Sequence, residues 1–186
     1  MLTDILAESL RQVRSLAEAM QVKNVSVQQE DMFELSFPAN TFDVVFCDVV
    51  ILYVEHPKSA VKEMLRVLKP GGTFIISVAN TYGIHTFFKW FQRIFRIPYR
   101  YGYEKSYSRR ELQNLLISVG ARVDAIDGFY VAYGLHRLKK TFPPAKFLSK
   151  ILNRVVKALD IFTNRFFSKH FGFEIFCVCT KDLVQD

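Results

Sequence analysis

The chain has 186 residues, half of them apolar, so it is long enough for one domain with a sizeable core and too short for two comfortable ones. Its net charge is +7, and no apolar run reaches the roughly 20 residues that span a bilayer, because Asp43 and Asp48 interrupt the longest candidate, Phe42 to Val54. The first residues lack the pattern of a secretory signal and only three cysteines are present, so we expect a reducing cytoplasm.

The first elements alternate between helix and strand. From Ile5 to Met20, apolar residues recur at spacings of three and four, which predicts an amphipathic helix that Asp4 could cap. A short strand is expected from Asn24 to Gln29, where valines alternate with polar residues. The nearly continuous apolar run from Phe42 to Val50 is typical of a strand buried on both faces of a parallel sheet.

A second helix and a buried strand follow. Lys58 to Leu68 has the apolar stripe of a helix. Pro70, Gly71 and Gly72 cannot continue this helix, and they predict a tight turn into the strand Thr73 to Ala79.

The second half repeats the alternation. Ser108 precedes a helix that Gly120 is placed to end, and the strand Arg122 to Ile126 follows. A long helix with apolar residues from Leu148 to Phe166 precedes a last strand, Phe173 to Thr180. Strands that alternate with helices imply an α/β sandwich, with a mostly parallel sheet and helices on both of its faces.

The three cysteines predict no metal site. Cys177 and Cys179 alternate with Val178, a spacing that matches neither a redox pair nor a usual zinc pair, so we interpret them as core thiols. Cys47 lies inside an apolar run and is also expected to be buried.

Positive charge is concentrated in two segments. Residues 81–110 hold seven basic residues and one acid, and residues 134–170 hold nine basic residues and one acid. The remainder of the chain has nine basic and 16 acidic residues, so an acidic scaffold carries two basic attachments.

Four ordered motifs resemble a known family. The series "VSVQQEDMFELSFPANTFDVVFCDVV", "AVKEMLRVLKPGG", "TFIISV" and "YSRRELQNLLISVGARV" is similar to the class I S-adenosylmethionine-dependent methyltransferases, in particular the small-molecule group related to quinone-biosynthesis methyltransferases. The resemblance implies one Rossmann-like domain over residues 1–186, with a lid-like insert at 81–107, a second helical insert at 134–170, and S-adenosylmethionine as the cofactor. The glycines after Lys69 identify this fold and not its chemistry.

The same resemblance implies an adenosine site. Asp31 matches the family's acid that receives the adenine amino group, and Met32 and Phe33 could lie against the flat ring. Asp4 matches the acid that holds the ribose hydroxyls. In each case a plain alternative stays open: Asp31 could simply end a strand, and Asp4 could cap a helix.

Two further residues match the active-site edge. Cys47 and Asp48 correspond to the segment after the family's fourth strand, in keeping with ligand binding at the carboxyl ends of parallel strands. Asp48 could orient the substrate or face the sulfonium, or it could be a solvated residue at a strand end.

One motif of the family is missing. Its members have a glycine-rich turn after the first strand, whereas the first glycine here is Gly71. We therefore expect an N-terminally truncated fold that begins in or just after the second strand and binds the cofactor poorly by itself. The sequence allows a truncated gene product, a partial record of a longer enzyme, or direct pairing of Asn24–Gln29 with Phe42–Val50.

The inserts suggest the acceptor. If the acceptor must lose a proton, His85 is the first candidate for a general base, although such a histidine is more often an ordinary surface residue. Residues 84–97 read as an amphipathic basic helix, which favours an apolar or anionic acceptor such as a small molecule or a lipid-linked compound. The simpler reading is a helix packed on the domain with its cations in solvent.

Two basic amphipathic helices also make peripheral contact with an anionic membrane plausible. Nucleic acid is the less favoured partner, because the cations alternate with bulky aliphatic residues and no RNA-binding motif is recognised. The alternative to a catalytic methyltransferase is a non-catalytic remnant of the fold that binds a membrane or a partner. An RNA methyltransferase is the weakest hypothesis and would require strongly salt-dependent RNA binding.

Overall fold

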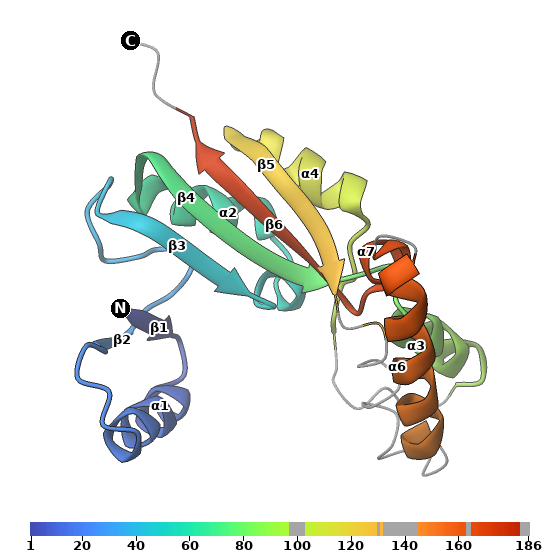
Figure 1. The fold of residues 1–186 in the computed structure, drawn as a ribbon. Coiled ribbons are helices and arrows are strands. Elements are labelled where there is room, and N and C mark those ends of the chain that lie inside the picture. Colours follow the sequence, from blue (N-terminus) through green and yellow to red (C-terminus); the bar gives the residue numbers. More distant parts are fainter. Residues whose placement is uncertain (97–102, 130, 132–144, 163–164, 183–186) are drawn as a thin grey trace.

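Two sheets organise the chain, which a computed structural model describes for residues 1–96, 103–129, 131, 145–162 and 165–182 (Figure 1). A small parallel sheet pairs β1 (Leu2–Asp4) with β2 (Val27–Gln29), and α1 (Ala7–Ala19) connects them. The larger sheet has the strand order β3-β4-β6-β5. Its strands are β3 (Phe42–Asp48), β4 (Leu68–Ala79), β5 (Ala121–Phe129) and β6 (Glu174–Lys181).

The larger sheet is mostly parallel. β3 and β4 run parallel, whereas β6 is antiparallel to β4 on one side and to β5 on the other. Three strands therefore share one direction and only β6 is reversed. The predicted mixed α/β, Rossmann-like class is confirmed, and the reversal of β6 is a detail that the strand pattern did not predict.

Helices fill the connections between these strands. They are η1 (Ile51–Tyr53), α2 (Pro57–Val67), α3 (Ile84–Ile94), α4 (Arg109–Ile117), α6 (Ala145–Phe162) and α7 (Phe166–Phe171). The predicted ends of α4 are confirmed, because Ser108 and Glu111 form a reciprocal capping box and Gly120 adopts a left-handed φ of 84°. Within the described ranges, no helix is long and apolar enough to cross a membrane.

One face of the larger sheet forms the core. Apolar side chains of α2 and α4, among them Leu65 and Leu112, pack against strand residues such as Phe74 and Cys177. Figure 1 shows α2 and α4 on this same side of the sheet. Cys47, Cys177 and Cys179 are all buried in this layer, as predicted for core thiols.

The opposite face is open at β3. Val44 is 55% exposed and Phe46 is 63% exposed, so the prediction of a strand buried on both faces is wrong. The physical reason is that α2 covers only the face on which Val45 and Cys47 lie. An apolar run alone does not distinguish a doubly covered strand from a singly covered one.

The glycine turn lies inside β4. α2 passes directly into β4, and the ladder partner moves from Phe42↔Leu68 to Val44↔Thr73, so the segment Lys69–Gly72 bulges out of the strand. Gly71 has a φ of 72°, and a Cβ on Gly72 would lie 2.8 Å from the carbonyl oxygen of Lys69. Glycine is therefore required here for the bulge and not for a separate turn.

The small sheet does not join the larger one. β2 pairs with β1 and β3 pairs with β4, so the predicted option of direct pairing between Asn24–Gln29 and Phe42–Val50 is wrong. In Figure 1 the β1–α1–β2 unit stands apart from β3. The loop before β3 attaches to α2: Glu63 accepts from the Leu35 amide, and Arg66 donates to the carbonyls of Leu35 and Phe37, each at 2.9 Å.

Candidate active site

The carboxyl ends of β1 and β2 bring two predicted acids together. Asp4 is paired with Gln29 in the ladder, and the Glu30 amide donates to the Asp4 carbonyl at 3.1 Å. Asp31 follows one residue later. Asp4 and Asp31 therefore share the same edge of the small sheet, which is the edge at which ligands bind in parallel α/β folds.

Each of these acids is held by the local backbone. Oδ1 of Asp4 accepts from the Leu6 amide at 2.8 Å, and Oδ1 of Asp31 accepts from the Phe33 amide at 2.9 Å. The N-cap of α1 is Leu6, so Asp4 fixes the turn before the helix and does not cap the helix itself. A carboxylate with one oxygen engaged in this way can accept hydrogen bonds from hydroxyls or amines through the other.

Glu30 is a buried acid that the sequence pattern did not single out. It is 8% exposed and accepts hydrogen bonds from the Ser36 amide at 2.8 Å, the Ser36 hydroxyl at 2.5 Å and Gln28 Nε2 at 2.6 Å. The hydrogen bonds from Ser36, the backbone one first, lower the pKa of Glu30 below its ordinary value. Glu30 thereby fixes the loop that carries Asp31.

The end of β3 holds a second group of polar atoms. The Ser77 hydroxyl donates to Asp48, and the Val49 amide lies 3.1 Å from Ser77 Oγ. Val49 has a φ of 58°, a left-handed conformation that a β-branched residue rarely adopts. Such strain costs about 1–3 kcal/mol and is concentrated at ligand sites. Ser77 was missed, although it is the only hydroxyl in the apolar run from Phe74 to Ala79.

The other predicted residues near this edge point elsewhere. Cys47 is buried, and burial raises the pKa of its thiol to about 11, so it is an inert core group. Met32 packs against the core, and Phe33 lines a pocket beside α2. The predicted stacking of Met32 and Phe33 on an adenine ring stays a prediction.

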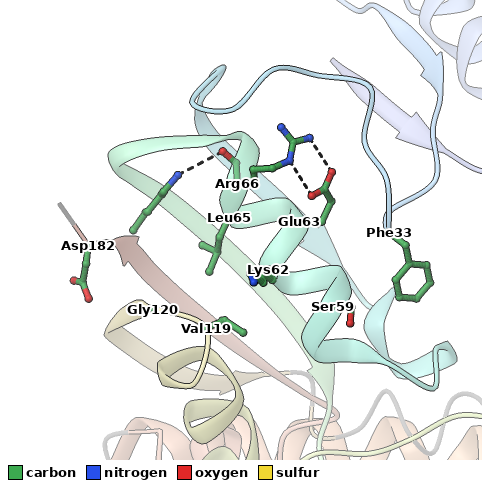
Figure 2. A pocket seen from close by; sticks show the side chains of 10 residues that line it. Phe33, Ser59, Lys62, Glu63, Leu65, Arg66, Val119, Gly120 and Asp182 are labelled. Atoms are coloured by element: carbon green, nitrogen blue, oxygen red, sulfur yellow. Dashed lines mark hydrogen bonds and ion pairs between the residues drawn. The ribbon is translucent and has the colours of Figure 1, made fainter. Parts of the chain in front are cut away.

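Figure 2 shows this pocket, which has a volume of about 530 Å³. Its polar side chains include Lys62 and the ion pair between Arg66 and Glu63 on α2. Gly120, just before β5, and Lys181, which pairs with the first residue of β5, also line it. The pocket therefore runs along α2, from Phe33 and Ser59 near the beginning of the helix to Gly120 and Lys181 at the amino end of β5.

His85 lies in a buried charged cluster. It is the second residue of α3 and is 5% exposed. Its Nε2 lies 3.6 Å from Oε1 of Glu104, and Lys89 Nζ lies 3.5 Å from the same oxygen. The His85 ring also contacts Phe173 edge-on, with the centroids 5.3 Å apart. The predicted general base thus lies beside a carboxylate, and it is covered from solvent.

Asn80 connects the segment before α3 to the loop before β6. Its side-chain amide donates to the carbonyls of His170 and Gly172 at 3.0 and 2.9 Å, and its Oδ1 accepts from the Tyr82 amide at 3.0 Å. This buried residue ties the beginning of the α3 insert to the loop before β6. The sequence gives no signal for Asn80 other than its place directly after β4.

Comparison with known proteins identifies the class. Residues 1–76 match the model of a methyltransferase domain. An uncharacterized methyltransferase of Schizosaccharomyces pombe is 28% identical over 143 residues, which are 76% of this chain and 49% of that protein. A ubiquinone/menaquinone biosynthesis C-methyltransferase of Stutzerimonas stutzeri is 41% identical over 76 residues, which are 40% of this chain and 30% of that protein.

Solved structures agree on the fold. A putative methyltransferase from Bacillus halodurans superimposes with a TM-score of 0.63 and 17% identity, over 97% of this chain and 81% of that one. The chain is related to the class I S-adenosylmethionine-dependent methyltransferases, which confirms the resemblance seen in its motifs. It spans about half or less of the length of these two curated relatives. The cofactor that this relationship implies is S-adenosylmethionine.

Proposed function

We propose that the chain supplies the adenosine-binding part of a methyltransferase that uses S-adenosylmethionine and acts on a small-molecule or lipid-like acceptor. The observation that supports this most directly is the shared edge of Asp4 and Asp31, which the hydrogen bond from the Glu30 amide to the Asp4 carbonyl holds together. In this proposal, Asp4 accepts hydrogen bonds from the ribose hydroxyls and Asp31 accepts one from the adenine amino group.

The donor set fits the adenosine half of the cofactor better than its methionine half. Both acids are acceptors, as an adenosine needs. The glycine-rich turn that lets the family's backbone approach the methionine part has no counterpart before Gly71. We therefore expect the chain by itself to bind S-adenosylhomocysteine weakly and mainly through adenosine.

Methyl transfer from a sulfonium is an in-line displacement, so the protein's main task is to hold the acceptor in near-attack geometry. We assign this positioning role to the exposed Asp48, which the Ser77 hydroxyl fixes. An apolar acceptor is supported by the quinone pathway in the name of one relative. If the acceptor must lose a proton, we assign the role of base to His85, whose Nε2 lies 3.6 Å from Glu104.

Saturation-transfer NMR with S-adenosylhomocysteine tests the cofactor site, because it detects weak binding. We expect saturation to reach the adenine and ribose protons and to be weak on the homocysteine protons. Asp31→Ala should reduce the adenine signal about tenfold or more, since a hydrogen bond to a charged group is worth roughly 1.5–3 kcal/mol.

Glu34→Ala is the matched control, because Glu34 is an exposed acid in the same loop. It should leave the adenine signal unchanged. Absence of saturation transfer, or equal losses in the Asp31 and Glu34 variants, would contradict the proposed function.

A further inference from the structure

Helix α3 exposes an apolar stripe to solvent. Phe87, Trp90, Phe91 and Ile94 recur at spacings of three and four, so they share one face of the helix. All four are exposed, with Phe87 at 60% and Trp90 at 58%. The opposite side of α3 carries the buried His85, together with Lys89, whose ammonium donates to the Glu104 carbonyl at 2.6 Å. The helix thus turns its most apolar face away from the fold.

Helix α6 repeats this arrangement. Leu148, Ile151, Val155 and Leu159 form an exposed apolar stripe, whereas Val156 is buried. Phe147 and Ile161 are exposed at 72% and 80%.

Cations accompany both stripes. The exposed basic residues are Arg93 and Arg96 on and just after α3, and Lys150, Arg154 and Lys157 on α6. At about 100° per residue, Arg93 and Arg154 lie beside the apolar stripes, whereas Lys150 and Lys157 lie on the opposite side of α6. The sequence of α6 contains a single acid, Asp160, and α3 contains none.

Both helices lie at the same end of the molecule. Figure 1 shows α3 and α6 beyond the end of the larger sheet at which β4 and β5 finish. α6 packs on α7, and α7 packs on β5, which fixes α6 at this end. The same end holds Asn80, so the exposed aromatic stripe and the cations lie beside the carboxyl ends of the parallel strands.

We propose that the exposed stripes of α3 and α6 dock this protein on the surface of an anionic lipid bilayer. An exposed apolar face with Arg and Lys on the polar surface of the helix is the pattern of helices that lie in the interfacial region, where the apolar side chains enter the acyl boundary and the cations are attracted by the negative surface potential of the lipids. The bulky apolar stripes favour a lipid surface over nucleic acid, and the excess of cations on both helices opposes pairing with a second copy. Docking requires neither cofactor nor acceptor, so it is independent of the proposed methyl transfer.

Trp90 is the only tryptophan of the chain and lies in the α3 stripe, so its fluorescence reports on the docking directly. Vesicles of phosphatidylcholine with phosphatidylserine should shift the Trp90 emission to the blue, and lipids brominated on the acyl chain should quench it. Phosphatidylcholine alone should give weak binding. Binding should also decline as salt is raised, because salt screens the attraction to the lipid phosphates.

Two variants separate the charges from the apolar stripe. The double variant Arg154→Glu, Lys157→Glu should lower the partition coefficient on phosphatidylserine vesicles roughly tenfold or more. The control Lys58→Glu, Lys62→Glu on α2 changes the net charge equally and should have a much smaller effect.

The double variant Phe87→Ser, Phe91→Ser should weaken both vesicle binding and the quenching of Trp90. The control Ile117→Ser, at an exposed site on α4, should change neither.

The outcomes that overturn the proposal are distinct. One is unchanged Trp90 emission and no sedimentation with anionic vesicles. Another is an emission shift that depends on protein concentration without lipid, which would assign the stripe to a second copy of the chain. A third is salt-dependent binding to single-stranded RNA without vesicle binding, which would assign the cations to nucleic acid.

Discussion

Ser36 supplies two of the three hydrogen bonds that the buried carboxylate of Glu30 accepts. These bonds favour the ionised form, so the pKa of Glu30 lies below its ordinary value of 4.5. A lowered pKa in the folded state contributes stability that is fully present above the unfolded value and is lost as the pH falls through the folded value. The loop that carries Asp31 is therefore held most firmly at neutral pH.

Ser36→Ala removes the hydroxyl and keeps the backbone donor. We expect the free energy of unfolding to fall by about 1 kcal/mol at neutral pH, and the difference from the parent to shrink as the pH drops below the ordinary pKa of glutamate. Urea unfolding over a pH series measures this. Ser15→Ala on α1 is the control, and a loss that persists at acid pH would show that Ser36 acts without Glu30.

The hydrogen-bond partners of the site residues explain which of them the sequence identifies. Asp4 and Asp31 were identified from the order of motifs, and the structure does bring them to one edge. Glu30 was not identified, because its partner Ser36 lies six positions along an irregular loop. Ser77 and Asn80 were not identified, because each also bonds a residue 28 or 92 positions away. A motif records neighbours along the chain, and such long-range hydrogen bonds leave no local pattern.

Helix and strand bounds were predicted accurately where residues close in sequence determine them. The Ser108 capping box and Gly120 bound α4 as expected, since a cap depends on residues within one turn. β3 was identified as a strand, but its burial on both faces was not a local property. Whether a helix covers the second face depends on the arrangement of the whole sheet.

The open face of β3 should tolerate charged substitutions. Val44→Lys with Phe46→Lys should change the free energy of unfolding by less than about 0.5 kcal/mol, because both side chains are already exposed. The double variant should also aggregate less, since charge on an edge strand opposes pairing between molecules. Light scattering and urea unfolding measure the two effects.

Phe74→Ala is the comparison on the covered face of the same sheet. Phe74 is fully buried, so truncation should lower stability by about 3–5 kcal/mol. Equal destabilisation by the two sets of substitutions would mean that the face of β3 is covered in solution.

For the whole molecule, the two sheets differ in what holds them. The larger sheet rests on a continuous core of α2, α4 and the four strands. In the β1–α1–β2 unit, Leu10 is the only buried apolar residue, so this unit has little core of its own. Its connection to α2 runs through the loop that Glu63 and Arg66 hold by hydrogen bonds. Segments with few buried contacts open more readily than the rest of a fold.

Arg66→Ala should therefore release the smaller unit without unfolding the larger one. Arg66 donates to two loop carbonyls and pairs with Glu63 at 2.8 Å, and the loss of such charged hydrogen bonds costs roughly 1.5–3 kcal/mol. We expect amide hydrogen exchange in α1 and β2 to accelerate about tenfold or more, while amides of β4 and β6 keep their protection. Arg122→Ala, which removes an exposed ion pair with Asp124 on β5, should alter neither region. Uniform acceleration across both sheets would show instead that the chain unfolds as one unit, and that Asp4 and Asp31 are as firmly placed as the core.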